Sequence, residues 1–378
     1  IPAMSVLRHR HVSRKVGPDN PLADKKVYIP RMPEASSLAF AHVFRWLGID
    51  ANLTPSSNER TRELGRKFSN GDECYPAIVT VGDFLRVIEQ PGFDPAKTVF
   101  FMPTAEGPCR FGQYHESYEM ALDGMGLKDF RLFLLAQDQL DQSPEKGGGL
   151  EINMPLSLGI VWAILCGDML TDMEYLTRPY EVTPGQTDKV MKESADYLFE
   201  VFQKRPIRGK KWGLLAWHFL SSYFADALRE VRKKFDAIEV DRLQVKPKIK
   251  VTGEFWLQTH EGDGNYNIKR WLEQEGSEVL PPPVAVWLGY LLHTPIWRLE
   301  KKANIDRKIR MKIAMVRGME KLYVGTYNRF RKALGNVPHE LPDQEELKEL
   351  ASPYFHYELR GGEGHMLVGK ALHAHLHK

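Results

Sequence analysis

Two patterns of apolar and polar positions alternate along the first third of the chain. Short continuous apolar runs, typical of strands buried in a parallel sheet, alternate with stretches whose apolar residues recur every three or four positions, as on one helix face. The predicted strands are 25–31, 48–55, 97–103 and 130–136. The predicted helices are 34–47, 56–68 (capped by Ser56 or Ser57), 76–90 and 112–126. This order indicates β-α-β units and a doubly wound sheet.

The pattern changes after a Gly-rich loop at 141–155. Helical periodicity dominates three stretches, 156–175, 187–203 and 211–237. A second α/β segment then begins, with strands at 248–255 and 277–283, a helix at 265–276 and further helices to the end. We therefore expect an α/β protein of two Rossmann-like lobes with parallel sheets and a helical insertion between them. The expected segments are a basic arm (1–24), a first lobe (25–150), a helical segment (151–245) and a second lobe (246–378).

Composition narrows the class of protein further. The 378 residues have a formal net charge of only +3, which gives no strong attraction to nucleic acid or to an anionic membrane. No apolar run is long enough for a membrane span, and no apolar core of a secretory signal follows the basic start. Three cysteines are too few for a disulfide-built secreted domain, so a reducing cytoplasm is the expected location.

Cysteines are the first candidates for chemistry. Cys74 and Cys109 each lie in a Gly/Pro loop where a helix is predicted to start. In an open α/β sheet such loops meet at the carboxyl edge, where ligands bind, and helix N-termini favour a thiolate. Packing is the default role of a free cysteine, so the spacing leaves packing, nucleophile and metal ligand open. Cys166 lies in an apolar helical run, where packing is favoured.

Two other segments combine glycine with polar residues. Gly262, Gly264 and Asn265 follow a predicted strand and could cradle a phosphate, although a plain turn and helix cap fits the same residues. His373 and His377 fall one turn apart on the last predicted helix and could form a metal pair. No acidic or cysteine partner lies near them in sequence, so an exposed helix end is the favoured interpretation.

Seven longer motifs resemble one family. They are VYIPRM (27–32), FRWLGIDANLTPSS (44–57), NGDECYPAIVTVGDFL (70–85), FFMPTAEGPCRFGQYH (100–115), RPYEVTPGQTD (178–188), GEFWLQTHEGDGNYNIKRWLEQEG (253–276) and GGEGHMLVGKA (361–371). Together the motifs resemble the 2-hydroxyacyl-CoA dehydratase-like iron–sulfur proteins, including the CoA-enzyme activase-related proteins of anaerobes. The resemblance extends from about residue 25 to the C-terminus.

The resemblance implies a function. Members of this family hold a 4Fe-4S or double-cubane iron–sulfur cluster between α/β lobes, and an ATP-dependent activase of actin/hexokinase-like fold supplies a low-potential electron. The electron serves dehydration of a 2-hydroxyacyl-CoA or reduction of a small molecule. Cys74 and Cys109 match two of the ligand cysteines. The chain itself has no actin-like ATP site, so the resemblance makes it the electron acceptor.

A third ligand motif, expected in the second lobe, does not occur in this sequence. The favoured explanation is that the rest of a longer polypeptide, or a sister subunit, supplies it, with Cys166 as a minor candidate. Two other functions stay open. One is a cluster-free scaffold that docks partner chains, and the other is a metal-free α/β enzyme that binds a nucleotide or CoA at Gly262–Asn265.

Overall fold

The computed structural model describes residues 22–104, 109–127, 130–136, 154–206, 209–302, 307–359 and 363–377. The protein is a mixed α/β structure whose first sheet has four parallel strands in the order β2-β1-β3-β4. These strands are β1 (Lys26–Ile29), β2 (Asp50–Leu53), β3 (Thr98–Thr104) and β4 (Arg131–Ala136). In the register, Lys26 is paired with Asp50 on one side and with Thr98 on the other. The predicted α/β class and the parallel first sheet are confirmed.

Helices cover both faces of this sheet, which explains the continuous apolar run in β3. Val99 and Phe101 point to the face that α1 covers, and Phe100 and Met102 point to the face that α3 and α4 cover. The helices of this unit are α1 (Glu34–Trp46), α2 (Glu59–Lys67), α3 (Tyr75–Ile88), the short η2 (Arg110–Gln113) and α4 (Tyr114–Gly124). Burial on both faces favours such unbroken apolar strands over alternating ones.

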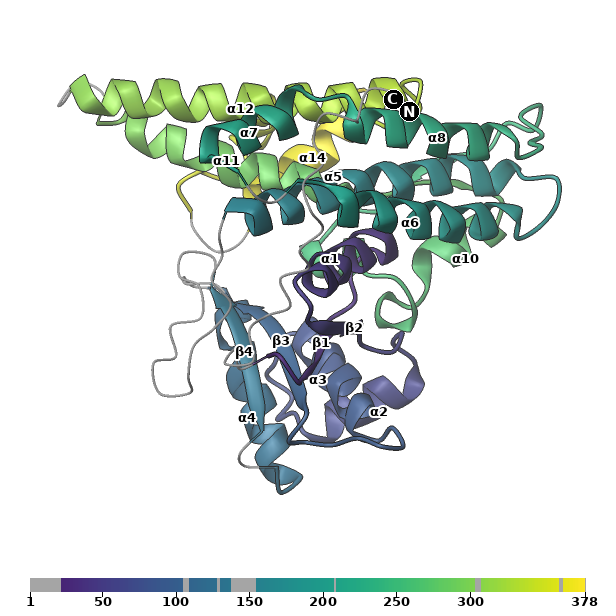
Figure 1. Cartoon of the computed structure of the whole chain (residues 1–378), viewed down its shortest axis with the longest axis vertical. Coiled ribbons are helices and arrows are strands. Elements are labelled where there is room, and N and C mark those ends of the chain that lie inside the picture. Colours follow the sequence, from purple (N-terminus) through teal and green to yellow (C-terminus); the bar gives the residue numbers. More distant parts are fainter. Residues whose placement is uncertain are drawn as a thin grey trace.

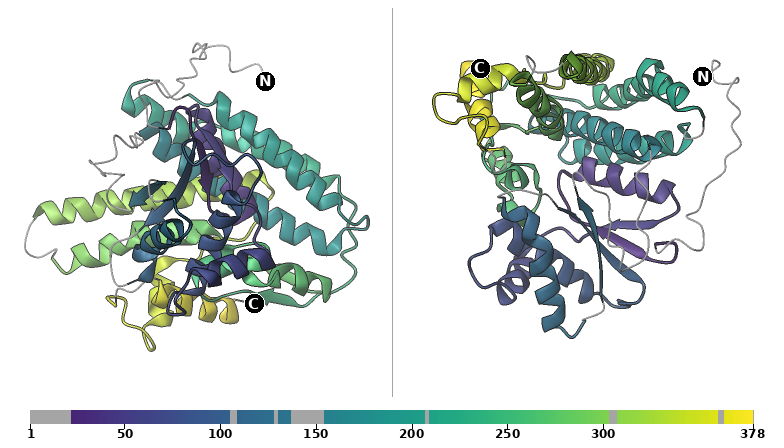
Figure 2. Two further views of the ribbon diagram at one scale, coloured as in Figure 1. Left: turned by 90° about the horizontal axis from the view of Figure 1, so that it is seen from below. Right: turned by 90° about the vertical axis from the view of Figure 1, so that its left-hand side faces the viewer.

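A broad layer of helices lies on the α1 side of the sheet, with α1 between the two (Figure 1). It contains α5 (Met154–Thr177), η4 (Arg178–Tyr180), α6 (Gln186–Lys204), α7 (Lys211–Leu220) and α8 (Tyr223–Asp236). The helical stretch predicted at 211–237 is confirmed and consists of two helices, because the chain is extended at Ser221, which ends α7, and α8 starts at Tyr223. The right-hand view of Figure 2 shows α1 lying between the sheet and the teal helices.

The second α/β segment is smaller than expected. Its strands β5 (Lys248–Lys250) and β6 (Glu278–Leu280) pair in parallel, and they are the only strands of this sheet among the described residues. The strand predicted for 248–255 is too long, because the Glu254 carboxylate accepts the Trp256 and Leu257 N–H groups and so caps a helix. The remaining elements are α9 (Phe255–Thr259), η5 (Asp263–Asn265), α10 (Ile268–Gln274), α11 (Val284–Glu300), α12 (Arg307–Ala333), α13 (Gln344–Ala351) and α14 (Gly364–Leu376).

Some predictions lie outside the described residues. They are the basic arm up to residue 21 and most of the boundary loop at 141–155. Within the part of the chain that the structure describes, no helix combines the length and apolar character needed to cross a membrane.

Candidate functional site

Cys74 and Cys109 lie at the starts of helices on one edge of the first sheet. Cys74 is the N-terminal cap residue of α3, and Cys109 is the cap residue of η2, which leads directly into α4. The Arg110 guanidinium donates a hydrogen bond to the Asp72 carbonyl, so the two cysteine loops are in direct contact. Both thiols are free, Cys74 partly buried and Cys109 exposed. The expectation that two separate loops meet at the carboxyl edge is therefore met by the geometry.

Two further side chains surround these cysteines. Tyr114, at the start of α4, is almost buried. Burial raises the pKa of its hydroxyl, and the nearby charges of Cys74, Glu254 and Cys109 raise it further. Glu254 comes from the second α/β segment, so that segment contributes a charge near Tyr114. Sequence reasoning did not select Tyr114 or Glu254, because neither belongs to a spacing pattern that indicates ligand binding.

Aromatic stacking joins the two segments beside Cys74. The ring of Tyr75 stacks on the ring of Tyr266, with centroids 5.8 Å apart and planes 6° apart. Tyr266 has a left-handed backbone (φ 60°) in the loop before α10, and the Arg62 guanidinium lies 5.7 Å from its ring centroid. The first residue of α3, next to Cys74, is thus stacked on the loop before α10.

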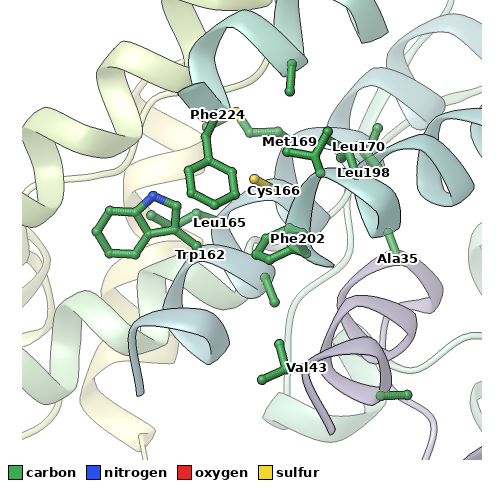
Figure 3. Packing of buried hydrophobic residues seen from close by; sticks show 14 of the residues in the cluster. Ala35, Val43, Trp162, Leu165, Cys166, Met169, Leu170, Leu198, Phe202 and Phe224 are labelled. Atoms are coloured by element: carbon green, nitrogen blue, oxygen red, sulfur yellow. The ribbon is translucent and has the colours of Figure 1, made fainter. Parts of the chain in front are cut away.

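Cys166 lies elsewhere in the molecule. It is in α5, is 1% exposed and belongs to the core cluster between α1 and the helical layer. Figure 3 shows its sulfur among apolar side chains that include Trp162, Phe202 and Phe224. Burial raises the pKa of this thiol well above its usual value, so the thiolate is disfavoured. The structure does not bring Cys166 to the cysteine pair, and its surroundings are those of a packing residue.

A buried cluster of hydrogen-bonded polar side chains joins the second α/β segment to the first. The Ser57 hydroxyl lies 2.8 Å from an Asp83 carboxylate oxygen and 3.0 Å from His260 Nε2. His260 Nδ1 lies 3.1 Å from the Arg31 carbonyl, so Nδ1 carries the proton and Nε2 accepts. Thr61 donates to the other Asp83 oxygen at 2.9 Å. We call Ser57, Thr61, Asp83 and His260 the junction.

Ser57 therefore has a different role from the predicted one. The cap of α2 is Asn58, whose side chain accepts the Thr61 N–H while Thr61 accepts the Asn58 N–H. The prediction of Ser56 or Ser57 as the cap is wrong, by two residues or by one. Asn58 is as good a cap as serine, and the local sequence could not distinguish between the three.

The loop at Gly262, Gly264 and Asn265 packs against this junction. The Asp263 N–H donates to the Ser57 carbonyl at 3.1 Å, and the Asn267 N–H donates to the Gly262 carbonyl at 3.0 Å. The Asn265 side chain donates to the His260 carbonyl at 2.5 Å. A Cβ atom on Gly264 would lie 2.5 Å from His260 Nε2, so glycine is required there for close packing. These donors are used within the protein, which favours the turn interpretation over a phosphate cradle.

The junction predicts a pH dependence of stability. Burial raises the pKa of Asp83 from 3.8 to about 7, so the native state holds a proton that the unfolded chain has lost. The contribution of Asp83 to stability therefore falls as pH rises toward 7. Asp83→Asn removes this titration. Relative to wild type, its free energy of unfolding is expected to rise by about 2 kcal/mol from pH 5 to pH 8, measured by urea denaturation.

His260→Gln is the matched control, because its stability relative to wild type is expected to change with pH in the opposite direction. Burial lowers the pKa of His260 from 6.5 to about 4, so the unfolded chain gains a proton below pH 6.5 that the native state refuses. The contribution of His260 to stability is lost as pH falls. The free energy of unfolding of His260→Gln is therefore expected to rise relative to wild type only below pH 6.5. An Asp83→Asn difference that does not change with pH would contradict a protonated buried carboxyl.

No protein-family model, curated protein or solved structure matches the chain.

Proposed function

We propose that the chain is an iron–sulfur protein that receives low-potential electrons, with Cys74 and Cys109 as cluster ligands. The observation that carries the proposal is the direct contact between the two cysteine loops at one sheet edge, through the hydrogen bond from Arg110 to Asp72. Neither cysteine side chain caps its helix, and neither thiol is in a disulfide. Thiolates are the usual ligands of iron–sulfur clusters.

Cys74 and Cys109 would provide half of the ligands that such a cluster needs. A cubane cluster is held by four thiolates, and the cysteine pair supplies two. The rest of a longer polypeptide or a sister subunit would supply the others. The cluster would contribute one-electron transfer, and the protein would tune its potential through burial and hydrogen bonds.

The family resemblance extends this proposal to partner and substrate. An ATP-dependent activase of actin/hexokinase-like fold would be the electron donor, in the cytoplasm of an anaerobe. The electron would serve a dehydratase-like reaction of a CoA thioester or the reduction of a small molecule. The β5–β6 unit would be the beginning of a second Rossmann-like lobe, because a β-α-β crossover in parallel is the repeating unit of that fold.

The test is purification without oxygen, followed by reconstitution with iron and sulfide and by iron analysis. The protein, expressed from its complete reading frame, is expected to be brown. Cys74→Ser and Cys109→Ser are each expected to lose most of the bound iron, and Cys166→Ala, in the core, is expected to retain it. A colourless, iron-free wild type, or full iron retention in both serine variants, would contradict the proposal.

One surface favours a second function, the docking of a partner chain without a cluster. Helix α12 exposes a row of large apolar side chains, Met311, Met315, Met319 and Leu322, at helical spacing. Methionine-rich faces adapt to partner surfaces. The serine variants separate the two functions, because a cluster-free scaffold would keep both its partner complex and its activity when Cys74 and Cys109 are replaced.

A further inference from the structure

The last two helices bring three metal-ligating side chains together. His373 lies in the last turn of α14, His377 is the residue that caps its C-terminal end, and Glu346 faces both from α13. Nε2 of His377 lies 2.8 Å from one carboxylate oxygen of Glu346, and Nε2 of His373 lies 3.7 Å from the other. One ligand atom from each of the three residues lies within 4.8 Å of the other two. Glu346 is the acidic partner that the local sequence did not reveal.

Helix packing holds this arrangement in place. A Cβ atom on Gly369 would lie 2.3 Å from the Leu347 carbonyl oxygen, so α14 rests directly on the backbone of α13 next to Glu346. The Asp343 carboxylate accepts the Glu345 and Glu346 N–H groups and so caps the first turn of α13. Leu347 is buried at 1% exposure. The right-hand view of Figure 2 shows these helices (yellow) at one side of the helical layer. Ligands on packed helices are positioned more accurately than ligands on loops.

We propose that His373, His377 and Glu346 form a binding site for a transition-metal dication of the zinc class. Two imidazole nitrogens and one carboxylate oxygen are a ligand set typical of zinc, whereas magnesium and calcium prefer oxygen alone. Three protein ligands leave a fourth position for water. Because the ligands come from two helices, the ion cross-links α13 to α14. The site uses none of the cysteines, and it is independent of the proposed iron–sulfur function.

The charges around the site are compatible with a dication. The neutral form of an imidazole is the one that binds metal, and Glu346 supplies the negative charge. Among the described residues, the Glu346 carboxylate pairs with the two histidines. Lys250 is a cation near His373, and its charge opposes the binding of a dication.

Zinc titration against a chromogenic chelator tests the site. The protein carries Cys74→Ser and Cys109→Ser, so that these thiols cannot compete for the metal. One zinc ion per chain is expected. His377→Ala and Glu346→Gln are each expected to weaken zinc binding by more than about tenfold. The His377 side chain is 55% exposed, so its removal does not disturb the core.

His375→Ala is the matched control, because His375 is exposed on the same helix but is not one of the three ligands. It is expected to bind zinc as wild type does, and zinc is expected to raise its thermal unfolding midpoint but not that of His377→Ala. Cobalt is expected to give ligand-field bands that disappear in His373→Ala. Zinc affinity that is unchanged in a His373→Ala, His377→Ala double variant, or equally weakened by His375→Ala, would overturn the proposal.

Discussion

Gly82→Ala is expected to lower the free energy of unfolding by about 3 kcal/mol, a large effect for the addition of one methyl group. In the native structure, a Cβ atom on Gly82 would lie 1.9 Å from the Thr61 carbonyl oxygen. The obstacle is backbone, so no side-chain rotation can relieve it. Gly65 is in the reciprocal position, where a Cβ atom would lie 2.0 Å from the Ile78 carbonyl oxygen. Helices α2 and α3 therefore touch backbone to backbone.

Gly82→Ala is also expected to disturb the hydrogen bonds of the junction. Thr61 and Asp83 are hydrogen-bonded at 2.9 Å across this helix crossing, so a shift of α2 lengthens that bond and the Ser57–Asp83 bond. Urea denaturation measures the loss of stability, and hydrogen exchange in α2 shows whether the disturbance is local.

Gly318→Ala is the control for Gly82→Ala. Gly318 lies within α12, and a Cβ atom there would meet nothing within 4 Å. Alanine is a better helix former than glycine, so the free energy of unfolding of this variant is expected to be about 0.5–1 kcal/mol higher than that of wild type. If Gly82→Ala costs no more than a few tenths of a kcal/mol, the close helix crossing is absent in solution.

Local sequence patterns account for most of the first sheet. The strands β1 to β4 and the helices between them follow the two periodicities, since burial on both faces of the sheet requires apolar runs and one-sided burial of helices requires an amphipathic stripe. Proline at the second position of α3 and Gly126, with its positive φ just after α4, add information about helix ends. These features depend on neighbours in the chain, which is why the sequence predicts them.

Contacts between distant residues could not be predicted in the same way. His260 meets Ser57 across 203 positions of the sequence, and neither residue belongs to a motif with a known spacing. Glu346 approaches His373 and His377 only because Gly369 allows α14 to rest on α13. Cys74 and Cys109 were an intermediate case. General rules for parallel sheets place their loops at the same edge. The contact between Arg110 and Asp72, however, could be found only from the structure.

Arg178→Met is the second variant with a large expected effect. The Arg178 guanidinium bonds both oxygens of Glu273, at 2.9 and 3.0 Å, and also pairs with Glu174. Side-chain exposure is 7% for Arg178, 9% for Glu174 and 7% for Glu273. These contacts join the end of α5 to α10, and so join the helical layer to the second α/β segment. Arg178 thus links segments that lie 95 positions apart in the sequence.

The variant removes the cation that pairs with both buried carboxylates, and among the described residues only Arg270, 3.5 Å from Glu174, still forms an ion pair with one of them. Removing one partner of a buried ion pair costs about 3–5 kcal/mol, and the remaining pair with Arg270 places the expected loss at the lower end of that range. Arg270→Met is the control, since Arg270 is 44% exposed, forms its shorter pair with the half-exposed Asp188 at 3.0 Å and lies 3.5 Å from Glu174, which keeps Arg178 as its partner in this variant. That change is expected to cost less than about 1 kcal/mol. Urea denaturation of both variants measures the difference.

A triple variant distinguishes loss of charge balance from loss of packing. Adding Glu174→Gln and Glu273→Gln to Arg178→Met removes the uncompensated charges, so most of the lost stability is expected to return. Burial already raises the pKa of Glu273 in the wild type, and removal of the cation raises it more. The single variant should therefore lose less stability at pH 5 than at pH 8. If the triple variant is no more stable than Arg178→Met, the arginine acts mainly through its packing against Tyr175, whose ring centroid lies 4.6 Å from the guanidinium carbon.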